Sequence, residues 1–203
     1  SETVRLSHVI ADQTVRSLQS VALALDIALD RLAQAEGLGV SVHDFGIHAM
    51  LVSRIEGLPQ LRSMFLVGAD GEVASSALSH PNPKFSVKDR DYFEIHKARA
   101  DVDLFLGKPV KNRVDGKWTL FLSKRIPTSN GQFDGVIAAS LDISYVEGLY
   151  DSIKAEDLSP IALYLNDGTL VARAPHEEAP IASRVVLPSL ERGGAENARF
   201  VTV

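Results

Sequence analysis

The first 36 residues contain neither glycine nor proline, and the first residue to interrupt this run is Gly37. Within it, apolar residues recur at alternating steps of four and three, the 3.5-residue seam of a coiled-coil-like helix. The seam consists of Val4, His8, Ala11, Val15, Leu18, Ala22, Leu25, Leu29 and Leu32. At 1.5 Å per residue such a helix is about 50 Å long, longer than a small domain. We therefore expect it to lie along two stacked units, to pair with its copy in a dimer, or both.

The composition is that of a globular chain and excludes several classes of function. Of the 203 residues, 45% are hydrophobic and 23% are charged, with a net charge of −5. Without a dense cationic block the chain lacks the positive field that nucleic acid binding requires. The absence of cysteine excludes disulfides, thiolate metal sites and thiol nucleophiles. We expect no nucleic-acid partner, no metal, no cofactor, and no stretch with the roughly 18 apolar residues of a membrane span.

Two similar hairpins are predicted 97 residues apart in the chain. Asp70-Gly71 and Asp167-Gly168 each separate two short apolar runs, and Asp-Gly favours a tight turn because such a turn needs positive φ. The repeat suggests two α+β units in tandem, each with an antiparallel sheet. The same offset aligns Val203 with Leu106, so we expect the second unit to be incomplete. Ser41 is predicted to cap a second helix that ends near Gly57.

The segment between the hairpins is predicted to complete the first sheet. Residues 88–96 indicate a loop that runs into a short helix, and 104–114, 117–126 and 135–142 indicate three strands joined by short turns. Nine of the 13 aromatic residues lie between positions 85 and 150. This crowding, with cations interleaved, favours an aromatic-walled pocket with a few polar anchors, while a larger core in the first sheet is the alternative interpretation.

These segments resemble a known family. The stretches 89–93, 106–110, 122–126 and 131–142 are similar to the double Cache (tandem PAS-like) sensor domains, which bacterial histidine kinases, diguanylate cyclases and chemoreceptors carry outside the membrane. The resemblance implies a long N-terminal helix (1–37), a membrane-distal unit (38–150) and a membrane-proximal, truncated unit (151–203). It also implies flanking transmembrane spans absent from this sequence, and a ligand held in the distal unit between its sheet and a covering helix-loop layer.

The resemblance also implies where ligand-binding residues lie. Amine- and amino-acid-binding members use an Arg followed closely by Trp-Tyr on the covering layer, and an Asp at the end of the last sheet strand. Here Arg90, followed by Tyr92 and Phe93, occupies the first place, and Asp142 the second. A guanidinium can grip a carboxylate and a carboxylate can accept from an ammonium. The alternatives are that Arg90 is a solvated charge and that Asp142 caps the helix that follows.

Further candidates come from strand alternation. Trp118 and Lys124 share one face of the 117–126 strand, and Arg125 lies on the other, so Lys124 and Arg125 are alternatives rather than partners. Ser140 points with Asp142, and His96 lies one helical turn after Tyr92, where it faces either the ligand or solvent. The excess of cations over Asp142 favours a small organic ligand that carries a carboxylate, amino-acid-like or not.

The sequence therefore predicts the extracytoplasmic, periplasmic sensing domain of a receptor in the bacterial inner membrane. The candidate ligand-binding residues are Arg90, Tyr92, Phe93, His96, Trp118, Lys124, Arg125, Ser140 and Asp142. We expect a homodimer through the N-terminal helix. No motif of a nucleophile elbow, phosphate loop or His-Glu-x-x-His site is present, so the chain itself is not expected to be an enzyme. The alternative is a structural or dimerisation spacer that binds no ligand.

Overall fold

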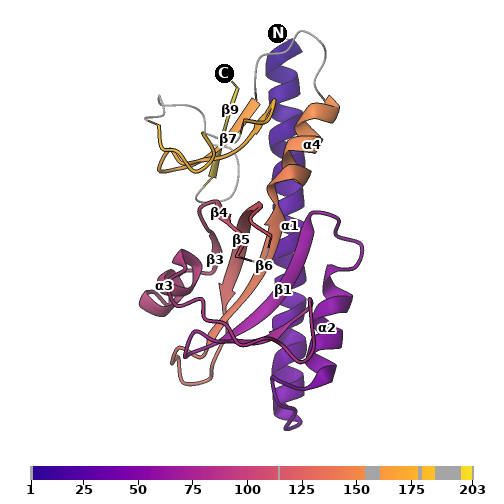
Figure 1. Cartoon of the computed structure of the whole chain (residues 1–203), viewed down its shortest axis with the longest axis vertical. Coiled ribbons are helices and arrows are strands. Elements are labelled where there is room, and N and C mark those ends of the chain that lie inside the picture. Colours follow the sequence, from indigo (N-terminus) through magenta and orange to yellow (C-terminus); the bar gives the residue numbers. More distant parts are fainter. Residues whose placement is uncertain (1, 114, 154–160, 178–179, 186–197, 203) are drawn as a thin grey trace. The chain divides into compact units, whose positions relative to one another are not determined.

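The structure is a computed structural model that describes residues 2–113, 115–153, 161–177, 180–185 and 198–202. Its helices are α1 (Glu2–Gly37), α2 (Phe45–Ile55), α3 (Asp91–Ala98) and α4 (Ile143–Ile153). Its strands are β1 (Leu61–Gly68), β2 (Val73–Ser76), β3 (Leu104–Leu106), β4 (Val110–Lys111), β5 (Trp118–Arg125), β6 (Gly135–Asp142), β7 (Ile161–Leu165), β8 (Leu170–Ala174) and β9 (Ala198–Thr202). Figure 1 shows these elements along the chain. Within the described residues, no helix is both long and apolar enough to cross a membrane.

The first sheet is antiparallel and has the order β2-β1-β6-β5-β3, with β4 also paired to β5. The predicted meander is confirmed, because β3, β5 and β6 come in this order along the chain and lie side by side in the sheet. Phe65 pairs directly with Ala138, and Leu106 with Leu122. The expected fold class, a long N-terminal helix with antiparallel sheets, is therefore what the chain adopts.

Each predicted hairpin forms at its Asp-Gly turn. Gly71 and Gly168 have φ of 79° and 85°, a region that residues with a Cβ rarely enter. The Asp before each glycine accepts a backbone N–H two residues later, from Glu72 and Thr169 respectively. The second hairpin joins β7 and β8 in a three-stranded sheet of order β8-β7-β9.

The buried face of α1 is rotated slightly from the predicted seam. Leu18, Leu25, Leu29 and Leu32 are buried as expected, but Val15 and Ala22 are only half-buried. Thr14, Val21, Ala24 and Ala28 are buried instead. The second buried row, Thr14, Val21 and Ala28, thus lies one position before the predicted row and keeps the same spacing of seven residues. The side chains of Val4, His8 and Ala11 lie outside the described part of the structure.

The start of α2 also differs from the prediction. Asp44, not Ser41, is the N-cap residue, and its carboxylate accepts the backbone N–H of Gly46 at 2.7 Å. Ser41 instead accepts the N–H of His43 in the preceding turn. Both residues are good cap formers, and only the path of the chain after Gly39 decides between them.

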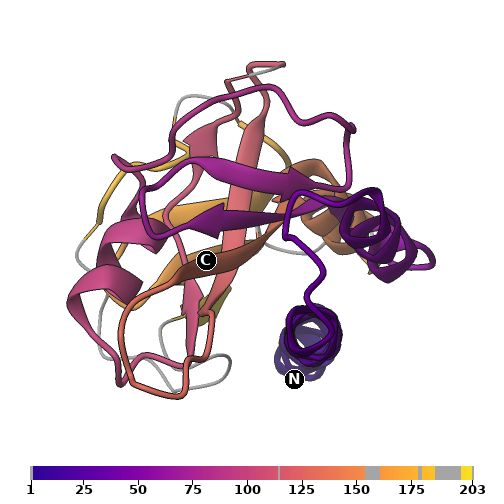
Figure 2. The ribbon, with the colours of Figure 1, turned by 90° about the horizontal axis from the view of Figure 1, so that it is seen from below.

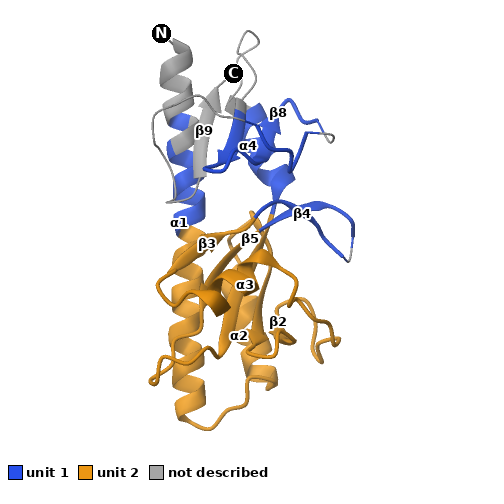
Figure 3. Cartoon of the chain, turned by 90° about the vertical axis from the view of Figure 1, so that its left-hand side faces the viewer, with its two compact units in different colours: residues 1–19, 108–120, 142–203 blue, residues 20–107, 121–141 orange. Residues whose placement is uncertain are grey.

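The chain divides into two compact units (Figure 3). One comprises residues 20–107 and 121–141, which include most of the first sheet, α2, α3 and the second half of α1. The other comprises 1–19, 108–120 and 142–203, which include α4 and the second sheet. We call them the first-sheet unit and the second-sheet unit.

The packing of α1 gives a testable prediction. Leu25 is fully buried, whereas Leu23, two residues away on the same helix, is 60% exposed. Leu25→Ala is expected to lower the free energy of unfolding by about 2–5 kcal/mol, because it removes buried methylenes and leaves a cavity. Leu23→Ala is the matched control and should change the free energy of unfolding of the monomer by less than about 0.5 kcal/mol. Denaturant unfolding measures both, and equal effects would contradict the burial of this face.

Candidate functional site

Helix α3 lies over one face of the first sheet and brings three of the predicted site residues with it. Tyr92, Phe93 and His96 are all buried. The Tyr92 ring lies 4.9 Å from that of Phe121 on β5, and both contact Phe65 on β1 edge-to-face. These three rings pack against one another between helix and sheet, as the alternative interpretation of a larger core expects, and the aromatic-walled pocket stays a prediction.

The two faces of β5 have different partners, which resolves the choice between Lys124 and Arg125. Ser123 and Arg125 reach α3, through His96 Nε2 and the His96 carbonyl respectively. Lys124 points to the opposite face, where its Nζ lies 2.7 Å from Asp26 of α1. Figure 2 shows α1 end-on and α3 on the other side of the sheet. Arg125, not Lys124, therefore lies on the face that α3 covers.

His96 is a buried titratable group at the centre of this layer. Its Nε2 lies 3.0 Å from the Ser123 hydroxyl, while its Nδ1 has no hydrogen-bond partner of good geometry among the described residues. Burial lowers the pKa of His96, because the imidazolium would lose its hydration, and the nearby Arg125 charge acts in the same direction. Hydrogen bonding with Ser123 and Val102 opposes the shift without cancelling it. The ring is therefore held neutral to lower pH than usual.

Arg125 ties the end of α3 to the turn between β5 and β6. Its guanidinium donates to the carbonyls of His96 at 2.8 Å and Gly131 at 3.0 Å, and it lies 5.2 Å from the centre of the Phe133 ring. Beside it is a cavity of about 320 Å³ between the α3–β3 loop and the β5–β6 turn. The cavity is lined by Ala100, Asp101, Val102, Asp103, Arg125, Pro127, Thr128 and Gly131.

The cavity carries charges of both signs. Asp101 and Asp103 stand on the α3–β3 loop and Arg125 on β5. Asp101 forms a 2.6 Å ion pair with Arg99, which lowers the pKa of the Asp101 carboxyl. Asp103 lies 3.3 Å from the Lys124 ammonium. A cavity with this lining can take an ammonium group on its acidic side and a carboxylate beside the guanidinium. Asp101 and Asp103 are not among the candidates predicted from the sequence.

Three further candidates have local partners. Arg90 is the N-cap residue of α3, where its carbonyl accepts from Phe93 and Glu94 and its side chain, which is half-buried, makes no capping bond. Ser140 is buried and donates to the Ser63 carbonyl at 3.4 Å. Trp118 stacks with Lys111, and its Nε1 has no hydrogen-bond partner among the described residues.

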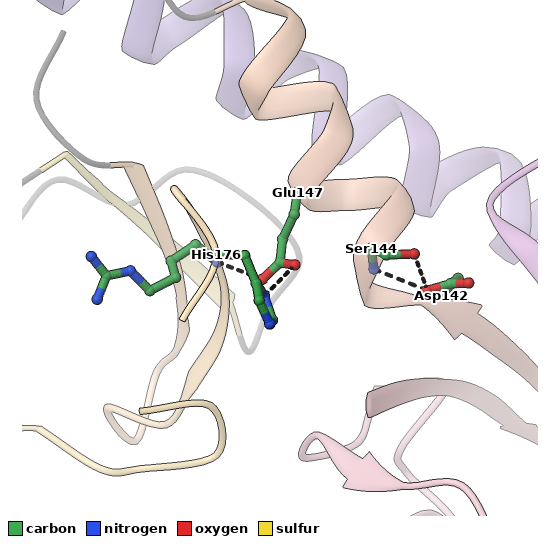
Figure 4. A network of polar contacts seen from close by, with 5 residues as sticks. Asp142, Ser144, Glu147 and His176 are labelled. Carbon is green, nitrogen blue, oxygen red and sulfur yellow. Dashed lines mark hydrogen bonds and ion pairs between the residues drawn. The ribbon is translucent and has the colours of Figure 1, made fainter. Parts of the chain in front are cut away.

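Asp142 caps α4. Its Oδ1 accepts from the Ser144 backbone N–H at 2.9 Å and from the Ser144 hydroxyl at 2.6 Å (Figure 4). This is the capping role that the sequence left as an alternative. Asp142 belongs to the second-sheet unit, whereas Arg90 and His96 belong to the first-sheet unit.

A second polar cluster, which sequence reasoning missed, lies in the second-sheet unit. Glu147 of α4 is buried and accepts from the Arg173 backbone N–H at 3.2 Å, and His176 Nδ1 lies 2.7 Å from its other oxygen (Figure 4). Tyr150, one turn later, is fully buried with its hydroxyl 3.3 Å from that of Thr14 on α1. The described residues hold no group of three or more metal-ligating side chains.

Comparison with known proteins finds relatives among solved structures. No family model matches the chain, and no curated protein matches it. The extracellular domain of rpHK1S-Z16, assigned as a histidine kinase, is 27% identical with a TM-score of 0.73, covering 89% of this chain and 71% of that one.

Two chemoreceptor domains show the same fold at lower identity. The ligand-binding domain of Pseudomonas aeruginosa PctB, in complex with L-Arg, is 15% identical with a TM-score of 0.71, covering 89% and 72%. That of Pseudomonas fluorescens CtaA, in complex with L-serine, is 15% identical with a TM-score of 0.65, covering 87% and 72%. The structural neighbours of this chain are thus extracellular sensor and ligand-binding domains of membrane receptors.

The depressed pKa of His96 predicts a pH dependence of stability. Unfolded chain binds a proton at His96 near pH 6.5, whereas the folded chain binds it only at lower pH. The free energy of unfolding therefore has its full value, as far as His96 is concerned, above about pH 6.5. It falls as the pH drops below that value, with a slope of at most about 1.4 kcal/mol per pH unit. Denaturant unfolding should be measured between about pH 7.5 and 5, a range that brackets this reference pKa. As the pH falls, the free energy of unfolding should decline less steeply for His96→Gln than for the wild type.

The matched control is His43→Gln, since the His43 side chain is exposed and lies outside this layer. That variant should retain the wild-type slope. Parallel curves for the wild type and His96→Gln would show that His96 does not resist protonation in the folded chain.

Proposed function

We propose that this chain is the extracytoplasmic sensing domain of a bacterial transmembrane signalling receptor, with the double Cache organisation of a helix (1–37), a distal unit (38–150) and a proximal unit (151–203). The fold and its neighbours among histidine kinase and chemoreceptor domains support this proposal. The chain itself performs no catalysis under this proposal. The output activity, a kinase, a diguanylate cyclase or a chemoreceptor, would belong to another part of the receptor.

The proposed ligand is a small zwitterion, such as an amino acid, bound in the distal unit. The observation that carries this proposal is the cavity of about 320 Å³ lined by Arg125 on one side and by Asp101 and Asp103 on another. Its volume lies within the range of about 300–1,000 Å³ usual for small-molecule sites. The guanidinium provides a planar donor for a carboxylate, and the aspartates accept from an ammonium.

The complexes of the neighbours support the same ligand class. PctB binds L-Arg and L-Gln, and CtaA binds L-serine, in domains of this fold. Among the residues predicted from the sequence, Arg125 lines this cavity, whereas Arg90, Tyr92, Phe93, His96 and Ser140 are not among its lining residues and stay predictions of the sequence. Trp118, Lys124 and Asp142 stay predictions of the sequence, each with the local partner described above.

One observation favours the second candidate, a spacer that binds no ligand. The rings of Tyr92, Phe121 and Phe65 pack together between α3 and the sheet, as they would in an architectural core. Dimerisation through α1 is proposed under either function. Val9 and Leu23 are exposed on α1 at 53% and 60%, and their separation of two heptads places them on one stripe of the helix.

The proposed function predicts ligand-dependent stabilisation. L-Arg, L-Gln, L-serine and simple organic acids form the panel, measured by thermal shift and titration calorimetry on the chain. A ligand present at 100 times its Kd should add about 2.7 kcal/mol to the free energy of unfolding. Asp101→Asn should weaken binding of that ligand about tenfold, because it removes one carboxylate that accepts from the ammonium.

The control variant is Asp134→Asn, which makes the same change of charge in the β5–β6 turn outside the residues that line the cavity. It should leave the affinity unchanged. A panel without any stabilising compound would favour the spacer, and equal losses in both variants would remove the cavity from the site.

A further inference from the structure

Lys124 is a buried cation that the proposed binding chemistry does not use. Only 9% of its side chain is exposed, and it stands on the face of β5 opposite Ser123 and Arg125. Its ammonium lies 2.7 Å from Asp26 Oδ1 on α1, and 3.3 Å from both carboxylate oxygens of Asp103 on the α3–β3 loop. The loop and the long helix are thus joined through a single ammonium group in the first-sheet unit.

The Lys124 ammonium has two carboxylate partners, one more than its single charge requires. A buried ammonium is costly without a paired anion, and here two carboxylates from different elements share it. Burial acts to lower the pKa of Lys124, but the hydrogen bonds to Asp26 and Asp103 outweigh it and raise the pKa. The group is therefore charged, and either aspartate alone leaves it paired.

The two aspartates are not equivalent. Asp26 is closer to the ammonium and its side chain is 50% exposed, whereas Asp103 is farther and 86% exposed. Asp103 is also one of the residues that line the cavity, and Asp26 is not. Asp103 is therefore both the partner that Lys124 loses more easily and the partner that a ligand can reach.

We propose that Lys124 couples the cavity to α1: a cationic group in the cavity competes for Asp103, and the Lys124 ammonium then pairs with Asp26 alone. This inference rests on the proposed function for the ligand, but the coupling is a property of the chain. A ligand that binds more tightly when Asp103 is not paired with Lys124 shifts the population toward molecules in which Lys124 pairs only with Asp26 of α1. In this proposal Lys124, which is not among the residues that line the cavity, acts as a positioning residue of the receptor.

Asp101 provides a matched control for Asp103. The two aspartates stand on the same loop, line the same cavity and are both largely exposed. Among the contacts of the described residues, Asp101 pairs with Arg99 and Asp103 with Lys124. Substitution of either by Asn removes one negative charge from the cavity, and only Asp103→Asn removes a partner of Lys124.

A double-mutant cycle on the chain tests whether Lys124 is shared. Asp26→Asn and Asp103→Asn should each lower the folding equilibrium constant modestly, because one carboxylate remains. The double variant should lower it by about fivefold or more beyond the product of the single effects, since the buried ammonium then has no anion. For the control pair, Asp26→Asn and Asp101→Asn, the effect of the double variant on the folding equilibrium constant should equal the product of the two single effects. In a Lys124→Met background this excess loss of the folding equilibrium constant should vanish. The proposal is overturned if the excess persists in that background, or if it is absent when Lys124 is present.

Hydrogen exchange of the α1 amides near Asp26 tests the coupling itself. Asp103→Asn should slow exchange there, because Lys124 then pairs with Asp26 alone, and Asp101→Asn should not. Lys124→Met should abolish the difference, and this variant replaces the ammonium by an apolar side chain of similar length, so folding is retained. Equal exchange in Asp103→Asn and Asp101→Asn overturns the proposal. If no member of the amino-acid panel binds, the proposed function is contradicted. The double-mutant cycle and the hydrogen-exchange experiment need no ligand, so they still test the coupling.

Discussion

Strand β5 is covered on both faces, and this constraint organises the first-sheet unit. The side chains of a strand alternate, so the residues of β5 in this unit face the α3 side and the α1 side in turn. Phe121, Ser123 and Arg125 contact the α3 side. Lys124 alternates with them and contacts α1. A polar residue on such a strand is largely removed from water and therefore needs a hydrogen-bond or ion-pair partner.

The polar groups of this unit follow from that constraint. The Ser123 hydroxyl is the partner of His96, the Arg125 guanidinium satisfies two backbone carbonyls, and the Lys124 ammonium is paired with two carboxylates. Arg125 and Asp103 each also border the cavity. The residues that hold the two layers onto the sheet are thus next to the residues that are available to a ligand. This proximity is the physical basis of the proposal that a ligand in the cavity alters how the layers are held.

Local patterns predicted elements better than partners. The Asp-Gly turns, the three-stranded meander and the long helix were all predicted correctly, because turn chemistry and periodicity act over a few residues. The buried face of α1 was predicted about one residue off, and Asp44 rather than Ser41 caps α2. Glu147 was missed, since nothing near it in the sequence announces His176 or the Arg173 amide as partners. The contribution of each candidate residue to binding stays a prediction.

The sequence by itself determined the long helix, the two Asp-Gly hairpins, the antiparallel meander, and the fact that Lys124 and Arg125 lie on opposite faces of one strand. Only the tertiary structure decided which face meets α3, because alternation is symmetric and carries no information about what covers each side. It also decided that Asp142 caps α4 and that Asp103 approaches Lys124, because those contacts depend on how the chain path brings distant segments together.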